Sequence, residues 1–86
     1  MRLYTFIYFL GEDLEKVKES LGDHITYWRK RKKELEFFRN GPFADKSGGL
    51  IIFSSSGFYE AEKLVNNDPL ITEKVLKNYW LKEWIS

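Results

Sequence analysis

The chain has 86 residues, the size of one small domain, and we treat residues 1–86 as a single unit. It contains no cysteine and one histidine, which excludes a disulfide framework and a zinc site built from cysteine and histidine. Its formal net charge is +1, so no global field draws nucleic acid or an anionic membrane. We therefore expect no nucleic-acid partner, no membrane partner and no metal.

The first half of the chain predicts a strand followed by two helices. Residues Leu3–Leu10 are rich in tyrosine, phenylalanine and isoleucine, as strands are. Residues Asp13–Leu21 carry apolar side chains at helical spacing, and Gly22 is predicted to end this short helix. A longer helix is predicted over His24–Arg39. The following Asn40-Gly41-Pro42 is typical of a helix end, because glycine favours the turn after a helix and proline stops it.

The second half predicts three strands and one further helix. The strands are expected at Pro42–Ala44, Gly49–Ser54 and Asn78–Ile85, the helix from a cap at Ser56 to Asn67, and a short helical turn near Leu70–Lys77. The order of elements is then βαββαβ. This order predicts the α+β class and a ferredoxin-like fold, with a four-stranded antiparallel sheet and both helices on one face.

The predicted strands are apolar on both faces, although helices cover only one. In the first strand Leu3, Ile7 and Phe9 point one way, while the aromatic residues between them point the other way. A small domain buries only about 60 to 65% of its unfolded surface, so further burial would stabilise it. We expect a homodimer that packs the two sheets together. The alternative is that these side chains form ordinary exposed apolar surface.

The start of the chain predicts a strand rather than a targeting segment. It is aromatic and β-branched, has no small-residue cleavage site and runs into acidic residues. No apolar run approaches the ~18 residues that a transmembrane helix requires. We therefore expect a cytoplasmic protein.

The residues offer one candidate for acid and base chemistry, because the common nucleophile and phosphate-binding motifs are absent. His24 lies at the start of the predicted long helix, where the helix dipole favours a neutral imidazole. A neutral imidazole at the boundary between protein and water suits a general base. Asp68 follows the second helix and is its candidate partner. The alternatives are a structural histidine and an aspartate that ends a helix and starts a turn.

The basic run Arg29–Lys33 raises the question of nucleic-acid binding. Five consecutive helical residues cover more than a full turn, so they do not form one patch, and most of them fit a solvated face. Lys32 lies between two apolar positions, so its stem either extends to water or brings its ammonium to a pocket. RNA-binding domains of similar element order carry two aromatic residues where this chain has Gly48 and Leu50. We therefore expect no RNA binding.

Several of these features together resemble the YCII-related (YciI-like) family over nearly the whole chain. They are His24, the segment Asn40–Asp45, Gly48-Gly49, Glu60-Ala61 and Asn67–Pro69. The resemblance implies a dimeric ferredoxin-like α+β barrel whose site lies between helices and sheet. In the family this site is built on a histidine and an aspartate, which correspond to His24 and Asp68.

The family resemblance also indicates a class of chemistry. One branch resembles a dehydrochlorinase of chlorinated hydroxyquinols, and relatives by fold include muconolactone isomerases and cofactor-free monooxygenases. The resemblance further suggests that Gly41, Pro42 and Phe43 form one wall of the pocket, and Arg31 or Lys32 is a candidate for holding a substrate oxyanion or carboxylate.

The leading hypothesis is a small lyase or isomerase that needs no cofactor and acts on a cyclic or aromatic metabolite. In it His24 exchanges a proton with the substrate, and Asp68 orients the imidazole. The alternative is a non-catalytic dimeric module that binds or senses a small molecule. A protein-binding or RNA-binding domain is the third interpretation.

Overall fold

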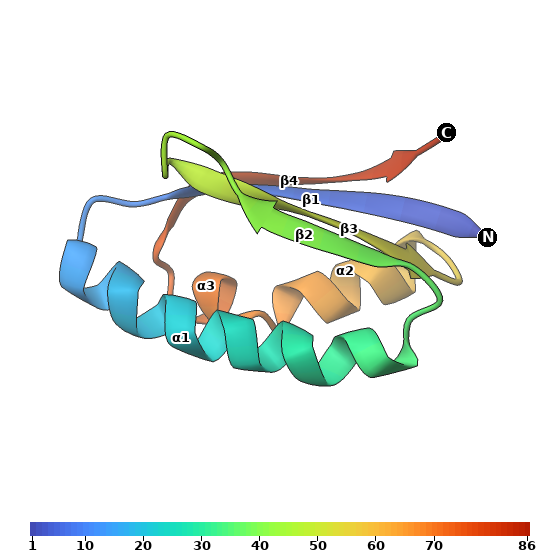
Figure 1. The fold of residues 1–86 in the computed structure, drawn as a ribbon, viewed down its shortest axis with the longest axis horizontal. Coiled ribbons are helices and arrows are strands. Elements are labelled where there is room, and N and C mark those ends of the chain that lie inside the picture. The colour runs from blue at the N-terminus through green and yellow to red at the C-terminus, as the bar shows by residue number, and fades with distance from the viewer.

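A computed structural model describes all 86 residues as one antiparallel sheet with helices packed on a single side of it (Figure 1). The elements in chain order are β1 (Arg2–Leu10), α1 (Leu14–Arg31), the 3-10 turn η1 (Lys32–Glu34), β2 (Phe38–Pro42), β3 (Gly48–Ser55), α2 (Phe58–Asn66), α3 (Pro69–Thr72) and β4 (Leu76–Trp84). The strand order across the sheet is β2-β3-β1-β4. This confirms the predicted ferredoxin-like α+β fold.

Alternation along the strands separates two apolar faces. Tyr4, Phe6 and Tyr8 of β1 are buried beneath the helices together with Ile51 and Phe53 of β3. The residues between them lie on the opposite face, which we call the outer sheet face. Its apolar members are Leu3, Ile7, Phe9, Leu50, Ile52, Trp80 and Trp84. No element of the chain covers this face (Figure 1).

The region before and around His24 is one continuous helix, so the predicted break at Gly22 is wrong. Helix α1 starts after Asp13, whose carboxylate accepts a hydrogen bond from the Lys16 amide. Glycine inside a helix costs only about 1 kcal/mol relative to alanine. The buried stripe of Val17, Ser20, His24 and Trp28 runs across the glycine position. Burial of this stripe outweighs the weak local preference of one residue for a turn.

The predicted helix end at Asn40-Gly41-Pro42 is also wrong, because Phe38–Pro42 is the edge strand β2. The helix ends at Arg31 and passes into η1. Phe38 pairs with Phe53 of β3, and its ring stacks on Trp28 at 5.9 Å between centroids. Proline is tolerated at an edge strand, where its missing N–H breaks no central ladder. The segment Asn40-Gly41-Pro42, whose residue types often end helices, therefore ends a strand here.

The C-terminal elements keep the predicted order with shifted ends. Helix α2 has Gly57 rather than Ser56 at its N-cap and no side-chain cap. The helical turn α3 is confined to Pro69–Thr72, and β4 begins at Leu76, two residues before the predicted start. No helix in the structure is both long and apolar enough to cross a membrane.

Two glycines give opposite expectations for alanine substitution. A Cβ at Gly48 would overlap the backbone of Tyr8 and Phe9, because β3 approaches β1 closely there, whereas a Cβ at Gly22 meets nothing within 4 Å. We expect Gly48→Ala to lower the free energy of unfolding by about 2 to 3 kcal/mol. Gly22→Ala should raise it by about 0.5 to 1 kcal/mol. Urea denaturation followed by circular dichroism measures both, and destabilisation by Gly22→Ala would contradict the continuous helix.

Candidate active site

A buried pair of side chains joins α1 to the turn before α3. His24 is 3% exposed and Asp68 is fully buried, and His24 Nδ1 lies 2.6 Å from Asp68 Oδ2. The structure thus brings together the two residues that the sequence proposed as partners. A carboxylate at this distance accepts the Nδ1 proton, which leaves Nε2 of a neutral imidazole with a free lone pair.

The local sequence explains how Asp68 reaches this position. Pro69 at the first turn of α3 keeps Asp68 extended, at φ −66° and ψ 130°. Its Oδ1 then accepts a hydrogen bond from the Leu70 amide at 2.8 Å, and its Oδ2 points back toward α1. The same carboxylate caps a helix and holds the histidine, so the two interpretations of Asp68 are not exclusive.

Trp28 is a third partner that the sequence analysis did not identify. Its Nε1 donates to Asp68 Oδ2 at 2.7 Å, beside the bond from His24. Trp28 follows His24 by four residues, so both side chains lie on the same face of α1. The four-residue spacing from His24 is the only feature of the sequence that indicates a role for Trp28 in the site. An indole on an apolar stripe is usually only part of the core. Three donors now surround one carboxylate and stabilise its negative charge.

The far side of the imidazole faces Tyr8, which the sequence analysis also did not identify as part of the site. The Tyr8 hydroxyl lies 3.5 Å from His24 Nε2, and the two rings are arranged edge to face. Burial raises the pKa of the Tyr8 hydroxyl to about 12, and the negative charge of Asp68 adds to the rise. The hydroxyl therefore stays protonated at neutral pH. A Cβ at Gly49 would overlap the Tyr8 hydroxyl, so this glycine leaves the space that the tyrosine occupies.

A hollow of about 200 Å³ lies beside His24, between α1 and the edge strand β2. We call it the α1–β2 hollow. Its lining residues are His24, Ile25, Trp28, Arg29, Lys32, Phe38 and Asn40. No group of three or more histidine, cysteine, aspartate or glutamate side chains is arranged to hold a metal ion.

The other predicted binding residues lie in different places. Lys32 lines the α1–β2 hollow, but Arg31 lies over the Tyr27 ring at 4.5 Å and lines another depression between α1 and α2. Gly41, Pro42 and Phe43 line a separate hollow of about 280 Å³ with Leu50 and Ile52 of the outer sheet face. Asn40 is common to both hollows. The edge strand β2 thus separates these three residues from His24.

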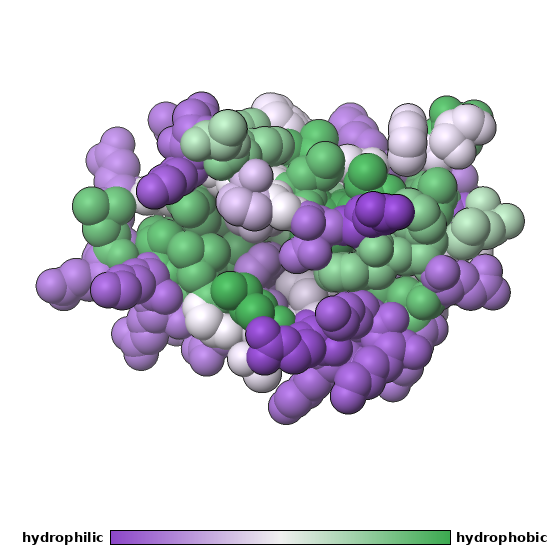
Figure 2. All heavy atoms as spheres, in the orientation of Figure 1, coloured by the Kyte–Doolittle hydropathy of each residue, from purple (hydrophilic) through white to green (hydrophobic).

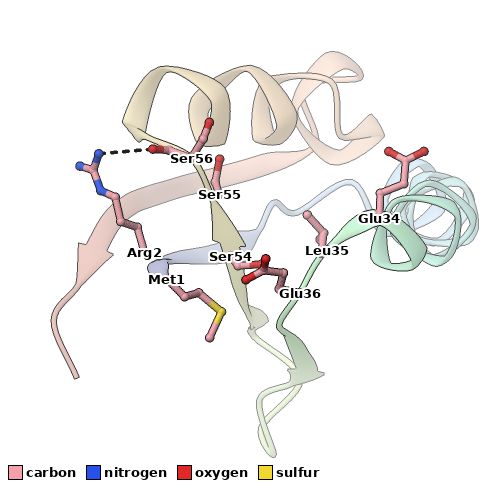
Figure 3. Close-up of a pocket in the computed structure, with 8 residues that line it drawn as sticks. All are labelled: Met1, Arg2, Glu34, Leu35, Glu36, Ser54, Ser55 and Ser56. Atoms are coloured by element: carbon pink, nitrogen blue, oxygen red, sulfur yellow. Dashed lines mark hydrogen bonds between the residues drawn. The ribbon is translucent and has the colours of Figure 1, made fainter.

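The largest hollow, of about 510 Å³, lies at the opposite end of the sheet and contains three consecutive serines (Figure 3). The Ser54 hydroxyl is already bonded to the backbone, because its Oγ accepts a hydrogen bond from the Phe37 amide at 3.0 Å. Arg2 donates to the Ser56 carbonyl and pairs with Glu83 at 2.8 Å. No imidazole or lysine lines this hollow to activate a serine hydroxyl. We assign the site to the His24–Asp68 pair instead.

The raised pKa of Tyr8 predicts a loss of stability in alkali. A tyrosine that ionises near pH 12 when folded and near pH 10 when unfolded stabilises the fold fully below pH 10, and this stabilisation is lost as the pH rises toward 12. At pH 11 the loss should be about 1 kcal/mol. Urea denaturation at pH 8 and pH 11 measures it, and Tyr8→Phe should show a smaller decrease than the wild type. Equal decreases in both proteins would contradict the assignment.

Comparison with known proteins agrees with this fold. The family model of the YCII-related domain matches residues 1–85. A search of curated protein sequences finds no match. Among solved structures, the chain is similar to 5-chloro-2-hydroxyhydroquinone dehydrochlorinase (TftG) from Burkholderia phenoliruptrix AC1100, in complex with 2,5-dihydroxybenzoquinone. The TM-score is 0.78 and the sequence identity 18%, over 96% of this chain and 93% of the other. The chain therefore belongs to the YCII-related domain family.

Proposed function

We propose that the protein is a small enzyme of the lyase or isomerase type, in which His24 exchanges a proton with a cyclic or aromatic substrate without a cofactor. The observation that carries this proposal is the buried contact of 2.6 Å between His24 Nδ1 and Asp68 Oδ2. Carboxylate and imidazole in this arrangement are a recurring device of acid and base catalysis, because the carboxylate fixes the tautomer and stabilises the imidazolium.

The surrounding contacts support a reversible role for His24 as base and acid. Asp68 is held by Trp28 and by the Leu70 amide, so it does not turn away when the imidazole gains a proton. The contact from Tyr8 to Nε2, at 3.5 Å, is at the outer limit of a hydrogen bond. A substrate proton donor therefore replaces it at little energetic cost.

The similarity to TftG supports dehydrochlorination as the first reaction to examine. In such a reaction His24 Nε2 would accept a proton from the substrate, and chloride would leave with the bonding electron pair. The neighbour shares only 18% of its sequence with this chain, so the support is for the class of chemistry and not for the substrate.

Release of chloride from 5-chloro-2-hydroxyhydroquinone tests the proposal. We expect His24→Gln to reduce turnover by about 10²-fold to 10⁴-fold, because this is the usual contribution of a positioned base. Asp68→Asn should also reduce it, whereas Asp45→Asn, on an exposed turn, should leave it unchanged. Full activity of His24→Gln would rule out the mechanism.

An NMR measurement examines the pair without any substrate. The His24 Nδ1 proton should give a resonance far downfield that persists at neutral pH, because a buried carboxylate holds it. The chain has one histidine, so the assignment is unambiguous. Loss of the resonance in Asp68→Asn, with the fold retained, would support the pair, and its absence from the wild type would contradict it.

One observation favours a non-catalytic binding module as the second candidate. His24 is only 3% exposed, and both of its ring nitrogens have partners in the free protein. A module that only binds a ligand would retain it chemically unchanged over hours. Recovery of unaltered 5-chloro-2-hydroxyhydroquinone from a stable complex would favour this candidate.

We also propose that the outer sheet face pairs with the same face of a second copy. Trp80 and Trp84 of β4 are 49% and 47% exposed there, next to Ile7 and Leu3 of β1. Apolar side chains gathered on one uncovered face are typical of a surface that binds another protein. Two sheets packed face to face would bury them in a symmetric interface.

The mass in solution tests this pairing. We expect light scattering to give twice the chain mass for the wild type and the single chain mass for Trp80→Lys, because a charge buried in an apolar interface is not tolerated. Tyr59→Lys is the matched control, since Tyr59 is 71% exposed on α2 and far from the outer sheet face. A monomeric wild type would exclude the dimer.

A further inference from the structure

The basic run Arg29–Lys33 spans the last residues of α1 and the start of η1, and its members have different surroundings. Arg29 and Lys32 line the α1–β2 hollow, Arg31 lies over Tyr27, and Lys30 and Lys33 line none of the hollows described above. Hydrophilic residues crowd over this end of α1 in Figure 2, on the side where β2 passes in front of the sheet. Two cations three residues apart therefore border the hollow that contains His24.

Neither of these two cations is neutralised within the chain. The ion pairs of the structure are Arg2 with Glu83 and His24 with Asp68, so Arg29 and Lys32 have no acidic partner. No carboxylate lines the α1–β2 hollow. The Asn40 side chain at its rim makes no hydrogen bond with the protein and offers both a donor and an acceptor. The polar groups of the hollow thus fit an anionic oxygen.

The size and walls of the hollow restrict the rest of the ligand. An apolar cavity of about 150 Å³ holds one benzene ring, so about 200 Å³ accommodates a single ring with one or two small substituents. It is smaller than the roughly 300 to 1,000 Å³ of sites for drug-sized ligands, so a single ring fits it better than a nucleotide does. Trp28 and Phe38 supply aromatic wall, with their rings 5.9 Å apart.

We propose that the α1–β2 hollow binds a small planar anion, a carboxylate or phenolate carried on a single ring, with Arg29 and Lys32 on its charge, Asn40 on a second polar group and the ring beside His24. This inference rests on the proposed function, because it names the substrate class of the same site. Because the whole chain has a net charge of only +1, the attraction for this anion comes from the charges beside the hollow.

Benzoate is the probe, and benzamide is its neutral counterpart of similar shape. Titration at low salt, followed by amide NMR, should shift residues 24–32 and 38–40 with benzoate, and benzamide should bind at least several-fold more weakly. The double variant Arg29→Gln with Lys32→Gln should weaken benzoate binding about tenfold, since each exposed ion pair contributes a factor of about 2 to 5.

The matched control is the double variant Lys30→Gln with Lys33→Gln, which removes the same charge at the same spacing from two residues that do not line the hollow. It should change benzoate binding by less than about twofold. Equal weakening by both double variants would show a general field of the basic helix end and overturn the proposal. Equal binding of benzamide, or shifts confined to other residues, would also overturn it.

Benzoate does not react, so this experiment separates the anion site from the proposed catalysis. If benzoate binds at the expected residues and activity does not depend on His24, the anion site is supported and the proton-transfer mechanism is wrong. If activity depends on His24 and benzoate shifts no amide resonance around the α1–β2 hollow, the anion site is wrong and the mechanism is supported.

Discussion

A fully buried carboxylate is the constraint around which the site of this protein is arranged. Asp68 is enclosed between α1 and α3, and a charge in that position is stable only when hydrogen bonds compensate for the lost water. The indole of Trp28, the imidazole of His24 and the Leu70 amide provide this compensation. Removing one partner of such a buried group typically costs about 3 to 5 kcal/mol, so the geometry of the site and the stability of the fold are linked.

The continuity of α1 follows from the same constraint. His24 and Trp28 meet Asp68 together only if the helix runs unbroken through both, and Val17 is buried on the same stripe about two turns before His24. A helix that ended at Gly22 would give up part of this burial in exchange for one favourable glycine conformation. The packing of a stripe of several side chains contributes several times more free energy than that preference.

How much the sequence predicts depends on how far each residue's partners lie along the chain. The element order and the two faces of β1 follow from local patterns, and both are confirmed. Residues that mark the ends of helices and strands are ambiguous, since Asn40-Gly41-Pro42 suits a helix end and an edge strand equally. Only the pairing of Phe38 with Phe53, a contact across the sheet, decides between them.

The site shows the same dependence on distant contacts. His24 and Asp68 stand out in the sequence because each is chemically unusual at its position, whereas Trp28 and Tyr8 look like ordinary core residues. Their polar atoms acquire a role only because Asp68 and His24 arrive next to them from other elements. Which cation of the basic run faces the hollow depends on the rotational phase of α1, and this phase is set by the burial of His24 and Trp28.

The rotational orientation of α1 also explains how a nearly neutral chain concentrates positive charge at one place on its surface. Successive residues of a helix are about 100° apart, so five basic residues in sequence distribute around its whole circumference. With His24 and Trp28 fixed toward the core, positions 29 and 32 lie at the border of the buried stripe, beside β2. Their charges act at short range on the α1–β2 hollow, while at distances beyond about 10 Å salt screens them and the acidic residues balance them. The buried carboxylate therefore fixes the position of His24 and, through the orientation of α1, the charges that border the hollow.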